Sequence, residues 1–242
     1  MDYNNELNFG TTTTRDRELS MSQAFPVLMR KVYVWMSLAL AITGITAFGV
    51  ANSPGVMSMI FGNQIVFWGL VIAELALVFA ISGAINRLSL STATMLFVLY
   101  SVINGAVLSS IFLIYTMTSI ASVFFITAGT FAVMALIGYT TKTDLTSMGK
   151  ILMMAIIGLI IASLVNVFLV KSSGFDLIIS YAGVLIFVGL TAYDSQKIKQ
   201  MLQMAPDASE ASQKLALVGA LSLYLDFINL FIYLLRILGK RE

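Results

Sequence analysis

Seven long runs of apolar residues alternate with short polar segments along the chain. The runs cover roughly residues 32–51, 65–85, 93–114, 119–139, 150–170, 177–196 and 215–238. Each run is long enough to cross ~30 Å of hydrocarbon as an α-helix, which takes about 20 residues. The prolines, Pro26, Pro54 and Pro206, lie outside the runs, so no span is expected to be kinked by proline. The pattern predicts an all-α membrane protein with seven transmembrane helices.

The segment that precedes the first run is polar. It contains four consecutive threonines, Thr11–Thr14, followed by charges of both signs, a composition that buries too little apolar surface to fold alone. We therefore expect residues 1–26 to form a disordered cytoplasmic tail and residues 27–242 to form a single seven-helix transmembrane domain. The first run has no clear cleavage site, so a signal peptide is not expected.

Basic residues gather on one side of the predicted membrane. Ten of them lie in the tail or in the connections after the second, fourth and sixth runs: Arg15, Arg17, Arg30, Lys31, Arg87, Lys142, Lys150, Lys197, Lys199 and Lys214. Cytoplasmic connections carry the excess of Lys and Arg, so this side and the N-terminus are predicted to be cytoplasmic. Arg236, Lys240 and Arg241 would lie outside if the last run crosses fully, and the side of the C-terminus is left open.

Composition narrows the chemistry of the interior. Hydrophobic residues make up 59% of the chain and charged residues 11%, well below the ~25% charged residues of a soluble domain. The sequence has no Cys and no His, which excludes disulfides, thiolate chemistry, the usual zinc ligands and the usual physiological pH switch. Any proton sensing must therefore depend on carboxyl groups.

The last run carries a polar stripe along one helical face. Its members are three or four residues apart: Gly219, Ser222, Asp226, Asn229, Tyr233 and Arg236. Asp226 lies near the middle of the run, where a carboxylate is costly unless it is paired, hydrated or protonated, so it is a functional candidate by default. The alternative is a structural Asp held by hydrogen bonds.

Two further acids lie within the runs. Asp194 is near the end of the sixth run, beside lysines with which it could simply pair. If it meets Asp226, the two carboxyl groups cannot both ionise freely and titrate as a unit, which makes a proton switch without histidine. Depth is a difficulty, because Asp226 is ~18 Å along a helix from Lys214, whereas Asp194 is close to the end of its span. Glu74, in the second run, is either a cation ligand or a hydrogen-bonded acid between helices.

These acids predict a pathway for cations. Ca²⁺ prefers oxygen ligands, and the absence of an EF-hand loop predicts weak, transient binding. The expected transient ligands are Asp194, Asp226 and Glu74, with Asn104, Ser222 and Asn229 along the pathway. Arg87, just after the second run, is a candidate partner for Asp194, or else an anchor at the membrane surface.

Several motifs resemble those of one family of membrane proteins. The segment Leu-Tyr-Leu-Asp-Phe-Ile-Asn-Leu-Phe within 220–236 resembles the C-terminal signature of the Bax-inhibitor family. Tyr193-Asp194 with Gln-Lys-Ile-Lys after it resembles the family's motif in the sixth span. Glu74 with Leu-Ala-Leu-Val-Phe after it resembles the second span, and 138–145 resembles the loop after the fourth. The resemblance covers about residues 26–240.

The resemblance implies a fold and a function. The fold is two groups of three helices around a central seventh, C-terminal helix. Bacterial members are pH-sensitive calcium leak channels, which implies a place in the bacterial inner membrane, a pH sensor and gate at Asp194 and Asp226, and a latch at Arg87. The expected partners are calcium ions, protons and the lipid bilayer, with no cofactor and no nucleic acid. The oligomeric state is left open, and a monomer is compatible with the sequence.

Other functions stay open. A proton-coupled cation exchanger would use the same acids, and a regulator that binds other membrane proteins would use them only structurally. An intramembrane aspartyl protease also places one Asp in each of two helices, but the residues before Asp226 are Leu-Tyr-Leu and no proline lies near the last helix. We therefore expect that the protein is not an enzyme.

Overall fold

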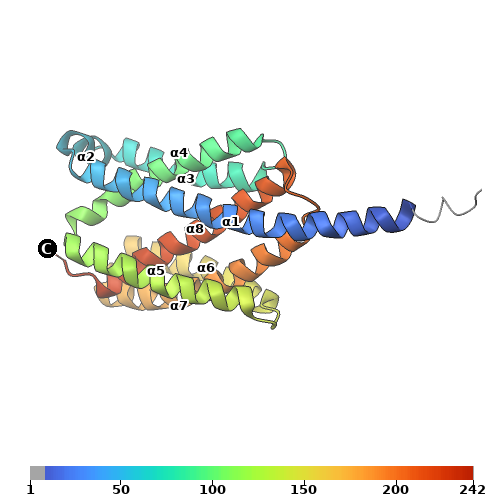
Figure 1. The fold of residues 1–242 in the computed structure, drawn as a ribbon. Coiled ribbons are helices and arrows are strands. Elements are labelled where there is room, and N and C mark those ends of the chain that lie inside the picture. The colour runs from blue at the N-terminus through green and yellow to red at the C-terminus, as the bar shows by residue number, and fades with distance from the viewer. Residues whose placement is uncertain (1–8, 242) are drawn as a thin grey trace, which may run out of the picture.

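The chain forms a bundle of long helices (Figure 1). In this computed structural model, residues 9–241 are described. The elements are α1 (Phe9–Ala51), α2 (Pro54–Phe61), α3 (Gln64–Gly83), α4 (Leu90–Leu108), a 3-10 turn η1 (Ser109–Leu113), α5 (Met117–Thr140), α6 (Thr146–Val165), a π-helical turn η2 (Asn166–Val170), α7 (Ser173–Gln203) and α8 (Glu210–Leu238). Seven helices in this part of the chain are long and apolar enough to cross a membrane, which confirms the predicted number.

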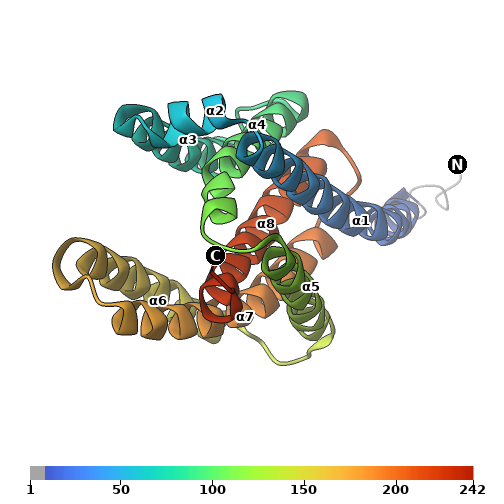
Figure 2. The same cartoon turned by 90° about the vertical axis from the view of Figure 1, so that its left-hand side faces the viewer.

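Helix α8 occupies the centre of the bundle (Figure 2). α1, α3 and α4 pack together on one side of it, and α5, α6 and α7 pack together on the other. About 67% of the spanning part of α8 is buried, against 6% for α3 and 11% for α6. The predicted arrangement of two three-helix groups around a central C-terminal helix is therefore confirmed.

The described part of the N-terminal segment is helical. α1 begins at Phe9 and passes through Pro26 without a break, and its first part projects beyond the bundle in Figure 1. A disordered tail is expected over residues 1–26, whereas the structure gives residues 9–26 as helix; residues 1–8 lie outside the described part. The domain boundary at residue 26 stays a prediction.

Helix α8 crosses the whole bundle. Near its start, Lys214 Nζ donates to the Leu88 carbonyl at 2.8 Å, in the connection between α3 and α4. Beyond its end, the backbone N–H of Thr116 donates to the Lys240 carbonyl at 3.2 Å, in the connection that leads into α5. These two connections are at opposite ends of the bundle, so the C-terminal residues lie at the end opposite to the α7–α8 turn.

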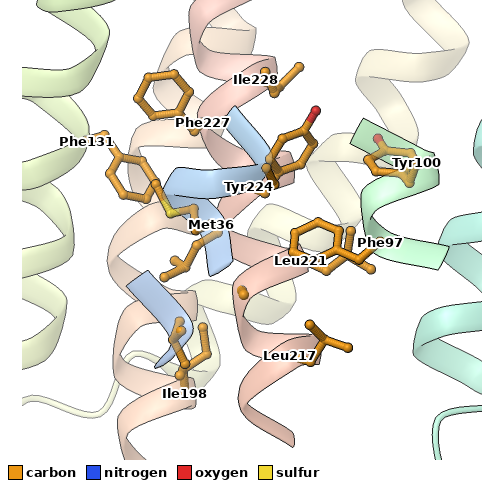
Figure 3. Packing of buried hydrophobic residues seen from close by; sticks show 14 of the residues in the cluster. Met36, Phe97, Tyr100, Phe131, Ile198, Leu217, Leu221, Tyr224, Phe227 and Ile228 are labelled. Carbon is orange, nitrogen blue, oxygen red and sulfur yellow. The ribbon is translucent and has the colours of Figure 1, made fainter. Parts of the chain in front are cut away.

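The core around α8 is built from large apolar side chains on all its sides (Figure 3). Tyr224 is fully buried and makes edge-to-face contacts with Phe97 and Tyr100 of α4 at ring distances of 5.8 and 5.6 Å. Phe227 points toward α5, where its ring is 5.5 Å from Phe131. Edge-to-face aromatic pairs contribute about 0.5–1.5 kcal/mol beyond their buried area, so they fix the rotation of α8.

Small residues let the surrounding helices approach one another. Helices in a membrane are not driven together by the hydrophobic effect and rely on close packing. At the crossing of α5 and α7, a Cβ on Gly138 would overlap the backbone carbonyl of Ala192. At the crossing of α1 and α4, a Cβ on Gly105 would overlap the Thr43 carbonyl. Both crossings therefore require glycine for contact between backbones.

The α5–α7 crossing can be tested with one methyl group. Gly138→Ala should destabilise the protein by about 1–3 kcal/mol, because the backbone of Ala192 cannot move away as a flexible side chain would. Gly129→Ala is the matched control, since it is on the same helix and its Cβ would meet open space. Thermal unfolding in detergent should show a lower midpoint for Gly138→Ala only, and equal midpoints would contradict the packing.

Candidate functional site

The contact between α7 and α8 has a constant antiparallel register. Gly183 on α7 faces the ring of Tyr233, and Ile198 covers Gly219, so the register is the same at both ends of the contact. This register places Asp194 opposite the segment 222–223 of α8. Asp226 is then about one helical turn, ~5 Å, deeper along the same seam. The two carboxyl groups are close enough for the charge of Asp194 to act on Asp226.

The expected difficulty of depth is resolved by the lengths of the helices. α7 does not end with its apolar run but continues to Gln203, nine residues beyond Asp194. α8 begins at Glu210, before its apolar run. Both acids therefore lie well inside the α7–α8 contact, and the structure brings them into one site.

Asp226 is the most demanding group in this site. Only 5% of it is exposed, and its Oδ2 is buried with no hydrogen-bond partner among the described residues. An unsatisfied buried polar atom is uncommon in folded proteins and calls for an explanation. A carboxyl oxygen in this position needs a proton, a cation or water. The alternative prediction of an Asp fully held by hydrogen bonds does not fit this oxygen.

Asp194 is half-buried, and the positive charge of Lys197 acts on its carboxyl group without forming an ion pair. Lys197 itself is exposed and lies over the Tyr193 ring, 5.7 Å from its centre. The structure does not bring Arg87 to Asp194, since Arg87 is exposed in the connection between α3 and α4. Among residues 21–241, whose side chains the structure describes, the one ion pair is Lys214 with Glu210, at 3.6 Å.

The polar residues that follow Asp194 hold α7 to α5 and α6. Ser195 Oγ donates to the Ala135 carbonyl at 2.8 Å, and Lys199 Nζ donates to the Tyr139 carbonyl at 2.8 Å. Gln196 accepts from the Leu145 N–H and donates to the Thr143 carbonyl, both at 2.8 Å. These bonds secure the α5–α6 connection and the end of α5. The motif around Asp194 is thus structural except for Asp194 itself.

A second buried polar cluster lies on the opposite side of α8. Asn104 Nδ2 donates to Glu74 Oε1 at 3.0 Å, and the Tyr224 hydroxyl donates to Asn104 Oδ1 at 2.9 Å. Thr43 Oγ1 lies 2.6 Å from the Tyr224 hydroxyl and 3.0 Å from the Ser101 carbonyl. We call this chain from Glu74 to Ser101 the Tyr224 network, and it ties α8 to α1, α3 and α4.

The Tyr224 network can be completed in two directions. With Glu74 ionised, the Asn104 amide donates to it, Tyr224 donates to Asn104, and Thr43 donates to Tyr224. With Glu74 protonated, its hydroxyl donates to the reversed Asn104 amide, and Tyr224 donates to Thr43. Thr43 then donates to the Ser101 carbonyl. Each hydroxyl has a single proton, so the state of Glu74 sets the direction of the chain.

The three predicted acidic ligands are therefore not assembled into one metal site. The side chains described, those of residues 21–241, include no group of three His, Cys, Asp or Glu that could hold a metal ion. The physical reason is helical geometry, because Tyr224 and Asp226 are two residues apart and point to opposite sides of α8. Glu74 and Asn104 lie on the Tyr224 side, and Ser222 and Asn229 share the stripe of Asp226. Asn229 donates within its own helix, to the Leu225 carbonyl at 2.8 Å.

The far end of the α7–α8 seam opens into a cavity of about 430 Å³. Its lining includes Asp176 and Ser180 of α7, Arg236 of α8 and Arg241 beyond it. Between this cavity and Asp226, the ring of Tyr233 stacks on Phe187 with 5.9 Å between ring centres. The polar stripe of α8 therefore runs along a closed seam against α7, from this cavity to the pair of acids.

The sequence analysis missed Tyr224 and Thr43. Tyr224 does not belong to the polar stripe, and its neighbours in the sequence are leucines. The sequence does contain one signal: Tyr224 comes two residues before Asp226, and this spacing places the two side chains on opposite sides of a helix. Its hydrogen-bond partners come from two other helices, α1 and α4, so their identity depends on how those helices cross α8.

The fold and the paired acids define a seven-helix membrane protein with an ionisable site at its central helix. The chain matches the family model "Inhibitor of apoptosis-promoting Bax1" over residues 26–242, and it belongs to the Bax inhibitor-1 family. It is 50% identical over 215 residues to the inner membrane protein YbhL of Escherichia coli K12, covering 88% of this chain and 92% of YbhL. A protein of uncharacterised function from Borreliella burgdorferi is 48% identical over 230 residues, covering 95% and 97%. An uncharacterised membrane protein of Streptococcus pyogenes is 40% identical over 186 residues, covering 77% and 80%.

The Tyr224 network predicts a stability difference between two conservative variants. Tyr224→Phe should destabilise the protein by about 1–3 kcal/mol, because the buried Asn104 oxygen and Thr43 hydroxyl lose their shared partner. Tyr100→Phe is the control, since its ring packs on Tyr224 and the network remains intact. Thermal unfolding in detergent is the measurement, and a Tyr224→Phe midpoint equal to that of Tyr100→Phe would rule out a stabilising network.

Proposed function

We propose that this protein is a pH-sensitive calcium leak channel in which Asp194 and Asp226 act as proton sensor and gate. The carrying observation is the buried Oδ2 of Asp226, which has no hydrogen-bond partner in the described part of the chain. In hydrocarbon such an oxygen needs a proton or a cation, and exchanging the two is the elementary step of a proton-controlled cation pathway. The protein acts by transport and catalyses no covalent reaction.

The pair works through its shared charge. A protonated pair carries at most one negative charge, which α7 and α8 can bury between them. When the shared proton leaves, two negative charges one helical turn apart repel each other and attract a cation. The same event therefore loosens the α7–α8 seam and prepares a site for the transported ion. This mechanism requires no histidine.

The seam supplies a route for the ion. Calcium would enter the cavity beside Asp176 and Ser180, pass the stacked rings of Tyr233 and Phe187, and reach Asn229 and Asp226. Few oxygen ligands line this route, which supports brief, weak binding, as a leak requires. The predicted orientation, with the N-terminus in the cytoplasm of a bacterial cell, would make the Asp194 end of the seam the cytoplasmic one.

Two exposed acids are unsuitable as the sensor and serve as controls. Hydrogen bonds from the side chain and then the backbone of Ser209 hold the pKa of Asp207 below its usual range. Those from the side chain and backbone of Thr146 do the same to the pKa of Asp144. A lowered pKa means that the associated stability is present above the ordinary pKa of about 4 and is lost only as pH falls below it. Both acids therefore stay ionised near neutral pH.

The proposal predicts how calcium flux depends on pH. In proteoliposomes loaded with a calcium-sensitive dye, flux through the wild type should change with pH as the pair of acids gains or loses its shared proton. Asp226→Asn and Asp194→Asn should flatten this dependence, because an amide cannot exchange a proton. Asp207→Asn should leave it unchanged. If Asp226→Asn and Asp194→Asn both show the same flux and the same pH dependence as the wild type, the two acids are not the sensor.

The same preparation separates a leak from an exchanger. A leak moves calcium only down its gradient at any imposed pH difference. If a proton gradient alone drives calcium uphill, the protein is a proton-coupled exchanger. If Asp226→Asn lowers the unfolding midpoint and no calcium flux is found for any form, the acids are structural and the protein acts by binding other membrane proteins.

A further inference from the structure

A groove between α1 and α5 opens on the apolar surface of the bundle. It has a volume of about 730 Å³, and α8 forms its floor through Phe227 and Phe231. Phe124 of α5 packs edge-on against both floor residues, at ring distances of 5.4 and 6.2 Å. We call this feature the α1–α5 groove.

The lining of the groove excludes water and ions as regular occupants. Of its lining residues only Ser37 and Thr43 have a polar side chain, and none is charged. The Thr43 hydroxyl belongs to the Tyr224 network. A bound water needs two to four polar partners, which this surface does not offer. The occupant must therefore be apolar.

The surroundings of the groove identify that occupant. Its walls belong to the segments Met21–Ala51 and Met117–Thr140, which are long and apolar enough to cross a membrane. The medium beside them is hydrocarbon, made of the acyl chains of phospholipids. The α1 wall extends from Met36 to Ala47, or ~16 Å of helix. One leaflet is half of a ~30 Å hydrocarbon core, ~15 Å, so one acyl chain matches the length of the groove.

We propose that the α1–α5 groove is a binding site for one acyl chain of a membrane phospholipid. The chain lies along α1 and rests on Phe227 and Phe231, and so fills the space that α1 and α5 leave over α8. It differs from the lipid around the protein because it reaches the central helix. The site does not depend on the proposed calcium flux.

Glycine at position 44 allows the site to be filled selectively. Gly44 lines the groove, and a Cβ there would meet open space, so Gly44→Phe places a ring in the groove without disturbing the backbone. Gly129→Phe is the matched control, because its Cβ also meets open space and it is not part of the lining. If Gly44→Phe fails to fold, Ala121→Phe fills the same groove from the α5 side.

The test uses a phospholipid with a photoreactive diazirine on its acyl chain. After illumination of proteoliposomes, mass spectrometry should find adducts concentrated on Leu40, Phe124 and Phe231. Gly44→Phe should lower these adducts by about tenfold, equivalent to ~1.4 kcal/mol of binding, and Gly129→Phe should leave them unchanged. Adducts on Leu136, an exposed residue of α5, report ordinary surface lipid and should be the same in all variants.

Two results would overturn the proposal. One is a groove labelled no more strongly than Leu136, which would mean ordinary lipid contact without a site. The other is full labelling of the groove in Gly44→Phe or Ala121→Phe, which would mean that the chain binds elsewhere. Unaltered calcium flux in the same variants would leave the lipid site standing, so the two proposals can fail separately.

Discussion

Burying a carboxyl group on the central helix is the constraint on which this bundle depends. Inside hydrocarbon, each polar group must find a partner within the protein, because the solvent offers none. Helix α8 presents ionisable or hydroxyl groups on two opposite sides, so it must be enclosed on all sides. Helices α1, α4, α5 and α7 pack directly around it, and glycine at the crossings of α5 with α7 and α1 with α4 lets them close together.

The two sides of α8 satisfy this constraint differently. On the α1, α3 and α4 side, Tyr224 joins a continuous chain of hydrogen bonds that ends at Glu74 and at the Ser101 carbonyl. On the α7 side, Asp226 keeps an oxygen without a partner within residues 9–241. A fully bonded cluster fixes helices in place, whereas an unsatisfied one is the group whose state can change. The bundle thus has one static half and one half suited to respond.

Much of this could be predicted from the chain. Runs of about 20 apolar residues identify the seven spans, and steps of three and four residues identify the stripe that contains Asp226. Residues further apart in the sequence were harder to place. Asp194 comes close to Asp226 because both helices extend beyond their apolar runs: α7 continues to Gln203, and α8 already begins at Glu210. Hydropathy alone does not show where these polar helix ends stop.

The partners of Glu74 could not be predicted for a different reason. Counting acids suggested that Glu74, Asp194 and Asp226 would share one ion, because all three lie within the apolar runs. The rotation of α8 separates them, since Tyr224 and not Asp226 faces α3 and α4. That rotation is set by aromatic packing against Phe97 and Tyr100, which depends on helix crossings that no local pattern encodes. The short helix α2 lies in the connection between the first two apolar runs and was not predicted. Its 8 residues are too few to show a helical period in the sequence.

The register of α7 against α8 has a mechanical consequence. At both ends of the seam a glycine faces a bulky side chain, Gly183 under Tyr233 and Gly219 under Ile198. These two close contacts set the register in which Asp226 lies one helical turn deeper than Asp194. A shift of one helical turn, ~5 Å, a step known for packed helices, would bring the two carboxyl groups level. Helix α7 would stay in place during such a shift, because Ser195, Gln196 and Lys199 hydrogen-bond it to α5 and to the α5–α6 connection.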